Sequence, residues 1–378
     1  MKKIISILLI ISILLVQALA FAGCESKGNG AGFGGNSNKG TNTETKLTKF
    51  KYSSFDYFDT VTTIVGYEET QEEFNAVCQE IKDLFNEYHR LFTIYNRYDG
   101  LNNLVTINDV VDGKHNVVEV DEKIIDMLLF SKEMYQKTNG AVNVAMGSVL
   151  KIWHVYRSHG SDDPANAELP PMADLVEASK HTNIDDLIID AENNTVFLAD
   201  PQMTLDVGAI AKGYAAEQVA KYLEAKGITG YLLNVGGNVR SIGMADIEKW
   251  KVGIENPDTS DESKPFIEYV KVAGESIVTS GTYQRFYIVD GKSYHHIIDP
   301  KTLMPGTKYL SVSIITNDSG LGDAMSTALF IMDYENGKAL VDSIENVEAM
   351  WVMPDGEQRY SDGFKDYTFD YEAEKKTG

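Results

Sequence analysis

Asp323, Ser326 and Thr327 lie at positions i, i+3 and i+4 of the stretch DAMSTAL, which follows a glycine-rich turn. In a helix this spacing places the three side-chain oxygens on one face. A hard cation such as Mg²⁺ prefers oxygen ligands and completes its shell with water or substrate phosphates. The alternative is an aspartate favoured by the helix dipole, with ordinary helix-surface hydroxyls beside it. Taken alone, the three residues favour this alternative.

A second candidate cluster combines Asp206 with Lys212, where a predicted strand turns through Gly208 into a helix. Free N–H groups at a helix N-terminus favour anions, and a lysine there adds a charge suited to phosphate. The alternative is a lysine on a solvated first turn beside a capping aspartate. Taken alone, Asp206 and Lys212 favour this alternative. The phosphate-binding loop GxxxxGKS/T does not occur in the sequence.

His295 and His296 stand side by side in YHHIIDP, at the end of a predicted strand. Because side chains alternate along a strand, Tyr294, His296 and Ile298 share one face, and His295 and Ile297 share the other. At most one of the two histidines therefore faces a site. A zinc site built from both is not expected, because the remaining ligands of a closed zinc site are not apparent.

Glycines and hydroxyl residues in LLNVGGNVRSIG and VTSGTYQR form a fourth candidate group. Gly236 and Gly237 allow the backbone to approach a bulky ligand closely. Thr279, Ser280 and Gly281 add hydroxyl and N–H groups at a strand end. Ordinary turn chemistry explains these residues equally well.

A mixed series of helices and strands must position these residues. Apolar periodicity and end signals predict helices over 70–92, 122–137 and 172–180, one after Gly208 that ends at Gly227, and one from 320. Strand patterns cover 50–67, 185–200, 231–243, 249–257, 268–281, 285–299 and 310–316. Strands often follow one another directly, which predicts an α+β fold with mixed, mostly antiparallel sheets and flanking helices.

Composition limits the classes of partner. The chain has 378 residues, of which 43% are hydrophobic and 24% charged, as in one large globular domain or two interleaved ones. Its net charge of −22 repels phosphate backbones, so nucleic acid is not expected as a partner. An anionic ligand must be bound locally, by a metal ion, backbone N–H groups or a placed lysine.

The N-terminus has the pattern of a secretory signal over residues 1–23, with Lys2 and Lys3 before an apolar stretch. Small residues precede Cys24, which resembles a bacterial lipoprotein signal with Cys24 as the lipidated residue. An uncleaved signal anchor is the alternative. A Gly/Asn/Ser-rich tether over 24–48 and one folded domain over 49–378 follow. Both interpretations place the domain outside the cytoplasmic membrane, on its extracytoplasmic face.

Taken in order, LDVGAIAKGYAAE, LLNVGGNVRSIG, VTSGTYQRF, HHIIDPKT and DAMSTAL resemble the ApbE family, the FAD:protein FMN transferases. The resemblance spans roughly Phe55 to Met353. It implies a T-fold-like domain that uses Mg²⁺ to cleave the pyrophosphate of FAD. FMN passes through a phosphoester to a threonine of a target protein, a subunit of a membrane redox complex, and AMP leaves. Family members are often lipoproteins, held at the cell membrane by a lipid anchor.

The resemblance also implies roles for individual residues. The metal would be held by the carbonyl of Ala209, by Asp323 and by Thr327, with Ser326 beside them. His296 would be the general base, with the near-neutral pKa that histidine has unperturbed. Contacts to FAD would come from Tyr95, Ala141, Val142, Asn143, Asp206, Lys212 and the backbone near Ile297.

The chain departs from the family pattern at three places: Asn143 where Asp is frequent, Val61-Thr62-Thr63 in place of Met-Gly-Thr, and Leu303-Met304-Pro305 after HHIIDPKT. Three other functions stay open. The same site could hydrolyse FAD to FMN and AMP, or a non-catalytic lipoprotein could store a flavin. A role in thiamine or iron–sulfur metabolism is the third, but the sequence supplies no cluster cysteines.

Overall fold

The computed structural model describes residues 46–377. Its helices are α2 (Gln71–Phe92), α3 (Leu104–Ile107), α4 (Glu122–Lys137), α5 (Gly147–Asp162), α6 (Met172–Ser179), α7 (Ala211–Ala225), α8 (Ser319–Ile331), α9 (Tyr334–Asp342) and α10 (Tyr371–Thr377). Its strands are β1 (Thr48–Tyr57), β2 (Thr60–Glu68), β3 (Val118–Glu119), β4 (Leu187–Asp190), β5 (Thr195–Leu198), β6 (Tyr231–Val235), β7 (Asn238–Ile242), β8 (Trp250–Glu255), β9 (Phe266–Val272), β10 (Ser276–Gly281), β11 (Phe286–Val289), β12 (Lys292–His295), β13 (Ser311–Thr316), β14 (Val347–Val352) and β15 (Gln358–Tyr360).

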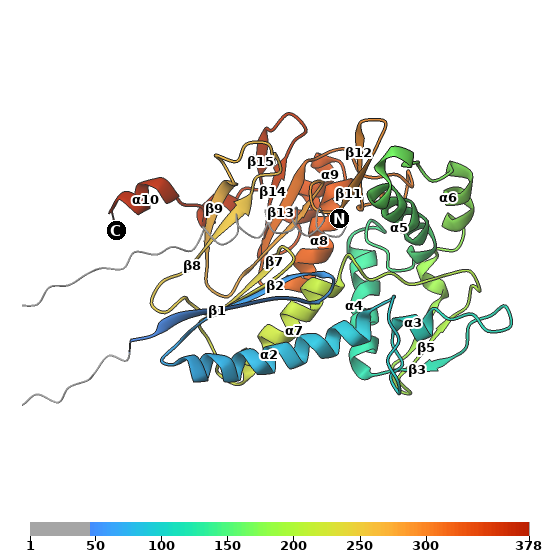
Figure 1. Ribbon diagram of the computed structural model, residues 1–378, viewed down its shortest axis with the longest axis horizontal. Coiled ribbons are helices and arrows are strands. Elements are labelled where there is room, and N and C mark those ends of the chain that lie inside the picture. The colour runs from blue at the N-terminus through green and yellow to red at the C-terminus, as the bar shows by residue number, and fades with distance from the viewer. Residues whose placement is uncertain (1–45, 378) are drawn as a thin grey trace, which may run out of the picture.

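An eight-stranded sheet forms the centre of the molecule, in the order β1-β2-β6-β7-β10-β13-β14-β15 (Figure 1). Every neighbouring pair in it is antiparallel. Tight turns make this order possible. The β6–β7 hairpin turns through Gly236 and Gly237, both at positive φ, which glycine adopts without steric cost.

The two faces of the sheet are covered differently. Helices α2, α7 and α8 pack on one face, and the β8–β9 hairpin packs on the other. In α2 the predicted apolar positions Phe74, Ile81 and Phe85 are buried in the core. On the opposite face, Trp250 and Val270 of the hairpin pack against Val65 and other sheet residues.

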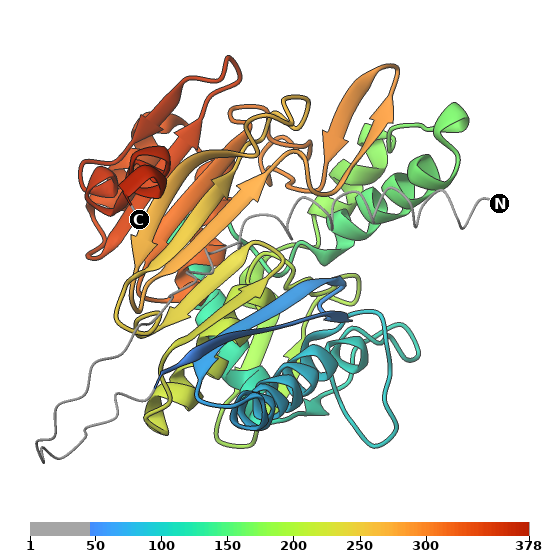
Figure 2. The same cartoon turned by 60° about the vertical axis from the view of Figure 1, so that its left-hand side comes forward.

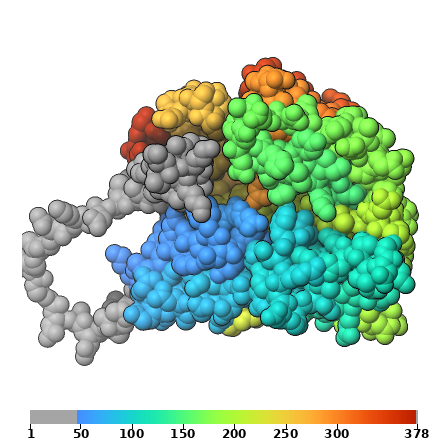
Figure 3. Space-filling model, turned by 45° about the vertical axis from the view of Figure 1, so that its right-hand side comes forward, coloured from blue at the N-terminus to red at the C-terminus, as the bar shows by residue number. Residues whose placement is uncertain are grey.

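Helices α3 to α6 and a small sheet in the order β3-β5-β4 lie between β2 and β6 in the sequence, together with α2 and α7. The orange β11–β12 hairpin lies beside α5 (Figure 2). In the space-filling view the green α5–α6 segment lies over the cyan segment that contains α3 and α4 (Figure 3). The β11–β12 hairpin and α5, which are far apart in the sequence, are thereby brought into contact.

The predicted α+β class with antiparallel sheets is confirmed. Helices α2, α4 and α6 and the β4–β5 and β11–β12 hairpins match their predicted ranges closely. Two differences concern the site. Helix α5 was not predicted, and the strand expected before Gly208 is reduced to a single parallel bridge between Met146 and Thr204.

No helix within residues 46–377 has the length and apolar character needed to cross a bilayer. The predicted lipidation residue Cys24, the signal and most of the tether lie outside the described residues. The folded domain begins with β1 at Thr48, next to the predicted boundary at residue 49.

Candidate active site

One cavity of about 1410 Å³ brings together nearly all of the residues predicted for the site. Ser326 does not line it. Its hydroxyl is buried, lies 2.9 Å from the Ser280 hydroxyl and donates to the Asp323 carbonyl at 3.0 Å. The predicted residues that line the cavity are Tyr95, Ala141, Val142, Asn143, Asp206, Ala209, Lys212, His296, Ile297, Asp323 and Thr327.

The N-terminal turn of α7 and the first half of α8 meet at the Asp323 carboxylate. This side chain is only 5% exposed. It accepts a hydrogen bond from the Gly213 amide at 2.9 Å, and the Lys212 ammonium lies 3.3 Å from both carboxylate oxygens. A Cβ on Gly213 would lie 2.2 Å from the Ser319 carbonyl oxygen and 2.5 Å from the Asp323 Cβ. Glycine at 213 is therefore what allows the two helices to approach this closely.

The donors predicted for a metal fit a hard cation. In a regular helix the Gly213 amide would donate to the carbonyl of Ala209, four residues earlier. It donates to Asp323 instead, and no backbone amide of the described chain bonds the Ala209 carbonyl. That carbonyl, the Asp323 carboxylate and the Thr327 hydroxyl are all oxygen donors, as Mg²⁺ requires. Within residues 46–377 no group of three or more His, Cys, Asp or Glu residues could hold a metal ion.

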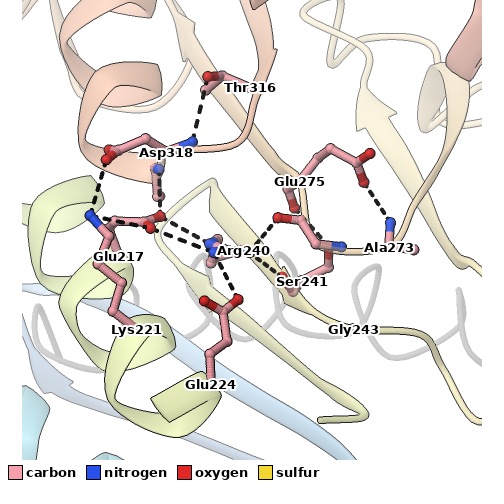
Figure 4. A network of polar contacts seen from close by, with 12 residues as sticks. Glu217, Lys221, Glu224, Arg240, Ser241, Gly243, Ala273, Glu275, Thr316 and Asp318 are labelled. Atoms are coloured by element: carbon pink, nitrogen blue, oxygen red, sulfur yellow. Dashed lines mark hydrogen bonds and ion pairs between the residues drawn. The ribbon is translucent and has the colours of Figure 1, made fainter. Parts of the chain in front are cut away.

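A buried ion-pair network fixes α8 against α7 (Figure 4). The Arg240 guanidinium on β7 donates through Nε to the Glu217 carboxylate on α7 at 2.9 Å, and through a terminal nitrogen to Glu224 at 3.0 Å. Glu217 also accepts from the backbone amide of Ser319, the first residue of α8, at 2.9 Å. The network therefore sets where α8 starts, four residues before Asp323.

The two adjacent histidines have separate environments. His295 is buried, donates through Nε2 to the Gly306 carbonyl at 2.6 Å and accepts at Nδ1 from the Ile297 amide at 3.2 Å. Its ring packs edge-on against Phe330. His296 instead lines the cavity, and its Nδ1 atom has no hydrogen-bond partner in the described chain. The alternation predicted for the strand end is thus correct.

The expected near-neutral pKa of His296 is wrong for this cavity. Burial lowers the pKa to about 3, and nearby positive charges add to the effect. Both causes disfavour the imidazolium form. The imidazole is therefore neutral at physiological pH. The charges belong to Arg285, Arg157 and Lys212, followed by His295.

Asp206 lies in a turn after the Thr204 bridge and not at the end of a regular strand. Its Oδ1 accepts from the Gly208 amide at 2.9 Å, and its own amide donates to the Val144 carbonyl at 2.8 Å. Burial raises the pKa of this carboxyl, while the Gly208 hydrogen bond opposes the shift. The turn thus fixes Asp206 in the cavity wall.

The Asn143 side chain is engaged within the protein. Its Nδ2 donates to the Thr182 carbonyl at 2.8 Å, and its Oδ1 accepts from the Ala145 amide at 2.9 Å. An ionised carboxylate, which the resemblance to the family led us to expect here, could not make the first of these bonds because it has no donor. Tyr95 is more open, with 55% of its surface exposed at the cavity.

Sequence reasoning did not single out two arginines and a histidine that line the same cavity. Arg157 and His154 come from α5, the helix that was not predicted. Arg285 follows the TSG segment that ends β10. The motif TSGTYQR already contained this arginine, but only the fold shows that it faces His296 and Asp206.

Comparisons with known proteins identify the family of this chain. The ApbE family model matches residues 58–351. The FAD:protein FMN transferase of Klebsiella pneumoniae is 34% identical over 272 residues, which cover 70% of this chain and 81% of the relative. The FAD:protein FMN transferase of Treponema pallidum is 34% identical over 264 residues, which cover 66% of this chain and 70% of the relative.

Solved structures give the same result. The crystal structure of the ApbE protein from Thermotoga maritima superposes with a TM-score of 0.73 at 26% identity, covering 85% of this chain and all of the other. The family predicted from the ordered motifs is thus confirmed, and the matched range includes all of the predicted residues that line the cavity. This chain belongs to the ApbE family.

Proposed function

We propose that this chain transfers FMN from FAD to a threonine hydroxyl of a protein acceptor and releases AMP. The observation that carries the proposal is the meeting of Asp323, Lys212 and His296 in one cavity. A cluster for phosphate and a neutral base are the two parts that a hydroxyl attack on a diphosphate needs. The names of the related transferases agree with it.

Charge neutralisation is the first task of the site. A divalent cation, Mg²⁺ in this proposal, would be held by the Ala209 carbonyl, Asp323 and Thr327. Bound there, it would neutralise charge on the pyrophosphate. The Lys212 ammonium, 3.3 Å from Asp323, adds a fixed positive charge at the same place. An acidic chain can bind an anionic substrate by this local arrangement.

Proton transfer is the second task. His296 is neutral, so it can take the proton of the threonine hydroxyl as the oxygen attacks the FMN phosphorus. The bond from that phosphorus to the bridging oxygen breaks, and AMP leaves with this oxygen. The negative charge of the diphosphate beside His296 would raise its pKa during the reaction, which makes it a stronger base.

The proposal extends to the place of the reaction. We infer that Cys24 carries a lipid anchor, which holds the domain at the extracytoplasmic face of the cell membrane. An acceptor in a membrane redox complex would then lie in the same layer. The tether over residues 24–48 would give the domain the reach to meet it.

The test is intact-mass analysis of an acceptor domain from a membrane redox complex after incubation with the protein, FAD and Mg²⁺. We expect one FMN on a threonine, and no adduct with EDTA. Asp323→Asn should lower the transfer rate at least about 100-fold, because it removes a ligand charge but keeps an acceptor for the Gly213 amide. The matched control is Asp342→Asn, which changes an exposed carboxylate that pairs with Lys338 on α9. This variant should retain the full transfer rate.

Two results would contradict the proposal. Release of FMN and AMP without a protein adduct, with every acceptor tried, would make the chain a hydrolase. FAD that stays intact would make it a flavin-binding protein. Full activity of Asp323→Asn would remove the metal assignment while leaving the transfer itself in place.

A further inference from the structure

Two arginines that line the cavity have no carboxylate partner in the described part of the chain. The Arg157 guanidinium donates to Nδ1 of His154 at 3.1 Å, and that of Arg285 donates to the Asp59 carbonyl at 3.0 Å. Within residues 46–377 neither forms an ion pair. Their remaining N–H donors are therefore available to a ligand, since a guanidinium has five.

This arrangement contrasts with the rest of a chain that has 56 acidic and 34 basic residues. Arg97, Arg240 and Arg359 each pair with a carboxylate. Arg90 stacks on the ring of Tyr98. Where carboxylates are this abundant, two neighbouring arginines without one indicate that their partner is not part of the protein.

The two charges also act on each other and on the cavity. Burial, and then repulsion from Arg285, lowers the pKa of Arg157. The carboxylate that faces both is Asp206, which already accepts the Gly208 amide. A phosphate between the guanidiniums would relieve their repulsion and accept paired N–H donors, the geometry in which arginine binds phosphate best.

We propose that Arg157 and Arg285 bind the phosphate of a mononucleotide, at a subsite separate from the Lys212–Asp323 cluster. The proposal deepens the proposed function and rests on it for its chemistry. Transfer to a hydroxyl turns the diphosphate into a phosphodiester on the acceptor and a phosphate monoester, AMP, and Lys212 with one cation beside Asp323 carries too little positive charge to neutralise both. The second phosphate gains negative charge in the transition state, so cations already in place beside it stabilise that state.

The test measures binding alone, with metal removed by EDTA. AMP and FMN are titrated separately into the wild-type protein, Arg157→Met and Arg285→Met, by calorimetry. We expect both variants to bind the same nucleotide at least tenfold more weakly, with a shallower dependence on salt. Arg97→Met, the same change at an exposed arginine outside the cavity, is the control and should bind as wild type.

The result identifies the phosphate. Weaker binding of AMP assigns the subsite to the leaving group, and weaker binding of FMN assigns it to the transferred group. Unchanged affinity for both nucleotides in both variants would overturn the proposal, as would equal weakening by Arg97→Met. Arg157→Lys, which keeps the charge but not the fork of donors, covers the case in which Arg157→Met fails to fold. The experiment measures nucleotide binding and not transfer. Its result can therefore be interpreted even if the transfer assay disproves the proposed function.

Discussion

At the scale of single residues, His295 and His296 show how one residue type serves two purposes in adjacent positions. Both nitrogens of His295 are used by the backbone around it, so it holds the loop after β12 in place. His296 has an unpartnered nitrogen and faces a cavity with positive charges. Burial and neighbouring charge, and not the residue type, separate the structural histidine from the one that we propose as the base.

The lowered pKa of His296 predicts the pH dependence of the reaction. A base is active when unprotonated, so activity falls only as the pH falls through its pKa, here about 3 in the free enzyme. We expect kcat/KM for FAD to show no acidic limb near histidine's ordinary value of about 6.5. The profile is measured from about pH 4 to about pH 9.

His296→Gln provides the comparison for this profile. It should lower the transfer rate by about 10²- to 10⁴-fold, the range for a lost general base, while binding FAD nearly as wild type. A limb near pH 6.5 in the wild-type profile that disappears in His296→Gln would show that the pKa is not lowered.

At the scale of elements, the contact between α7 and α8 builds the site. It is held at two levels along the helices, by Gly213 with Asp323 and by Glu217 with the Ser319 amide. Arg240 balances the buried charge of Glu217 from the neighbouring strand. Loss of the contact between Glu217 and the Ser319 amide would shift the start of α8. Asp323 would move with it, because it belongs to the same helix.

Arg240→Met is therefore expected to lower the free energy of unfolding by about 1–3 kcal/mol, because it leaves the buried Glu217 with only the half-exposed Lys221 ammonium, 3.6 Å away, as its counter-ion. Urea denaturation followed by circular dichroism measures the change. Arg359→Met removes an exposed arginine from a pair with Glu357 and should cost less than about 1 kcal/mol. Equal losses in the two variants would show that the network does not stabilise the α7–α8 contact.

The sequence predicted some elements well and missed α5 for a physical reason. Helix α2 has regular apolar spacing and a capping box between Thr70 and Glu73, both local signals. Helix α5 begins after Met146, which provides no side-chain cap, and it contains a glycine at each end. Its first amide bonds the Thr204 carbonyl and its apolar face packs against β11. Contacts with residues distant in sequence therefore stabilise α5, and no local sequence pattern predicts it.

At the scale of the whole molecule, charge is distributed unevenly. The chain carries a net charge of −22, yet Lys212, Arg157 and Arg285 lie close enough to His296 in one cavity to lower its pKa. The overall charge disfavours binding to polyanions, while in the proposed function these local cations bind a small phosphate ligand. Overall composition alone would have argued against an anionic substrate.

The proposed anchor gives a prediction at this scale. Cys24→Ala should move the protein from the washed membrane fraction to the soluble fraction, because the acyl chains supply the membrane affinity. Immunoblotting of both fractions measures this. Cys78→Ala is the control: that thiol is buried in the core, and its loss should not change the distribution. Retention of Cys24→Ala in the membrane would favour the uncleaved signal anchor.

The sequence by itself determined the family, the α+β class and most of the candidate site. Ordered motifs with Asp206, Lys212, His296 and Asp323 were sufficient, because these features depend on residue type and short spacing. Only the tertiary structure decided the rest: the lowered pKa of His296, the turn of the Ser326 hydroxyl away from the cavity, and the two cavity arginines that form no ion pair within residues 46–377. Burial and charge–charge distance produce each of these, and both arise only when distant segments pack together.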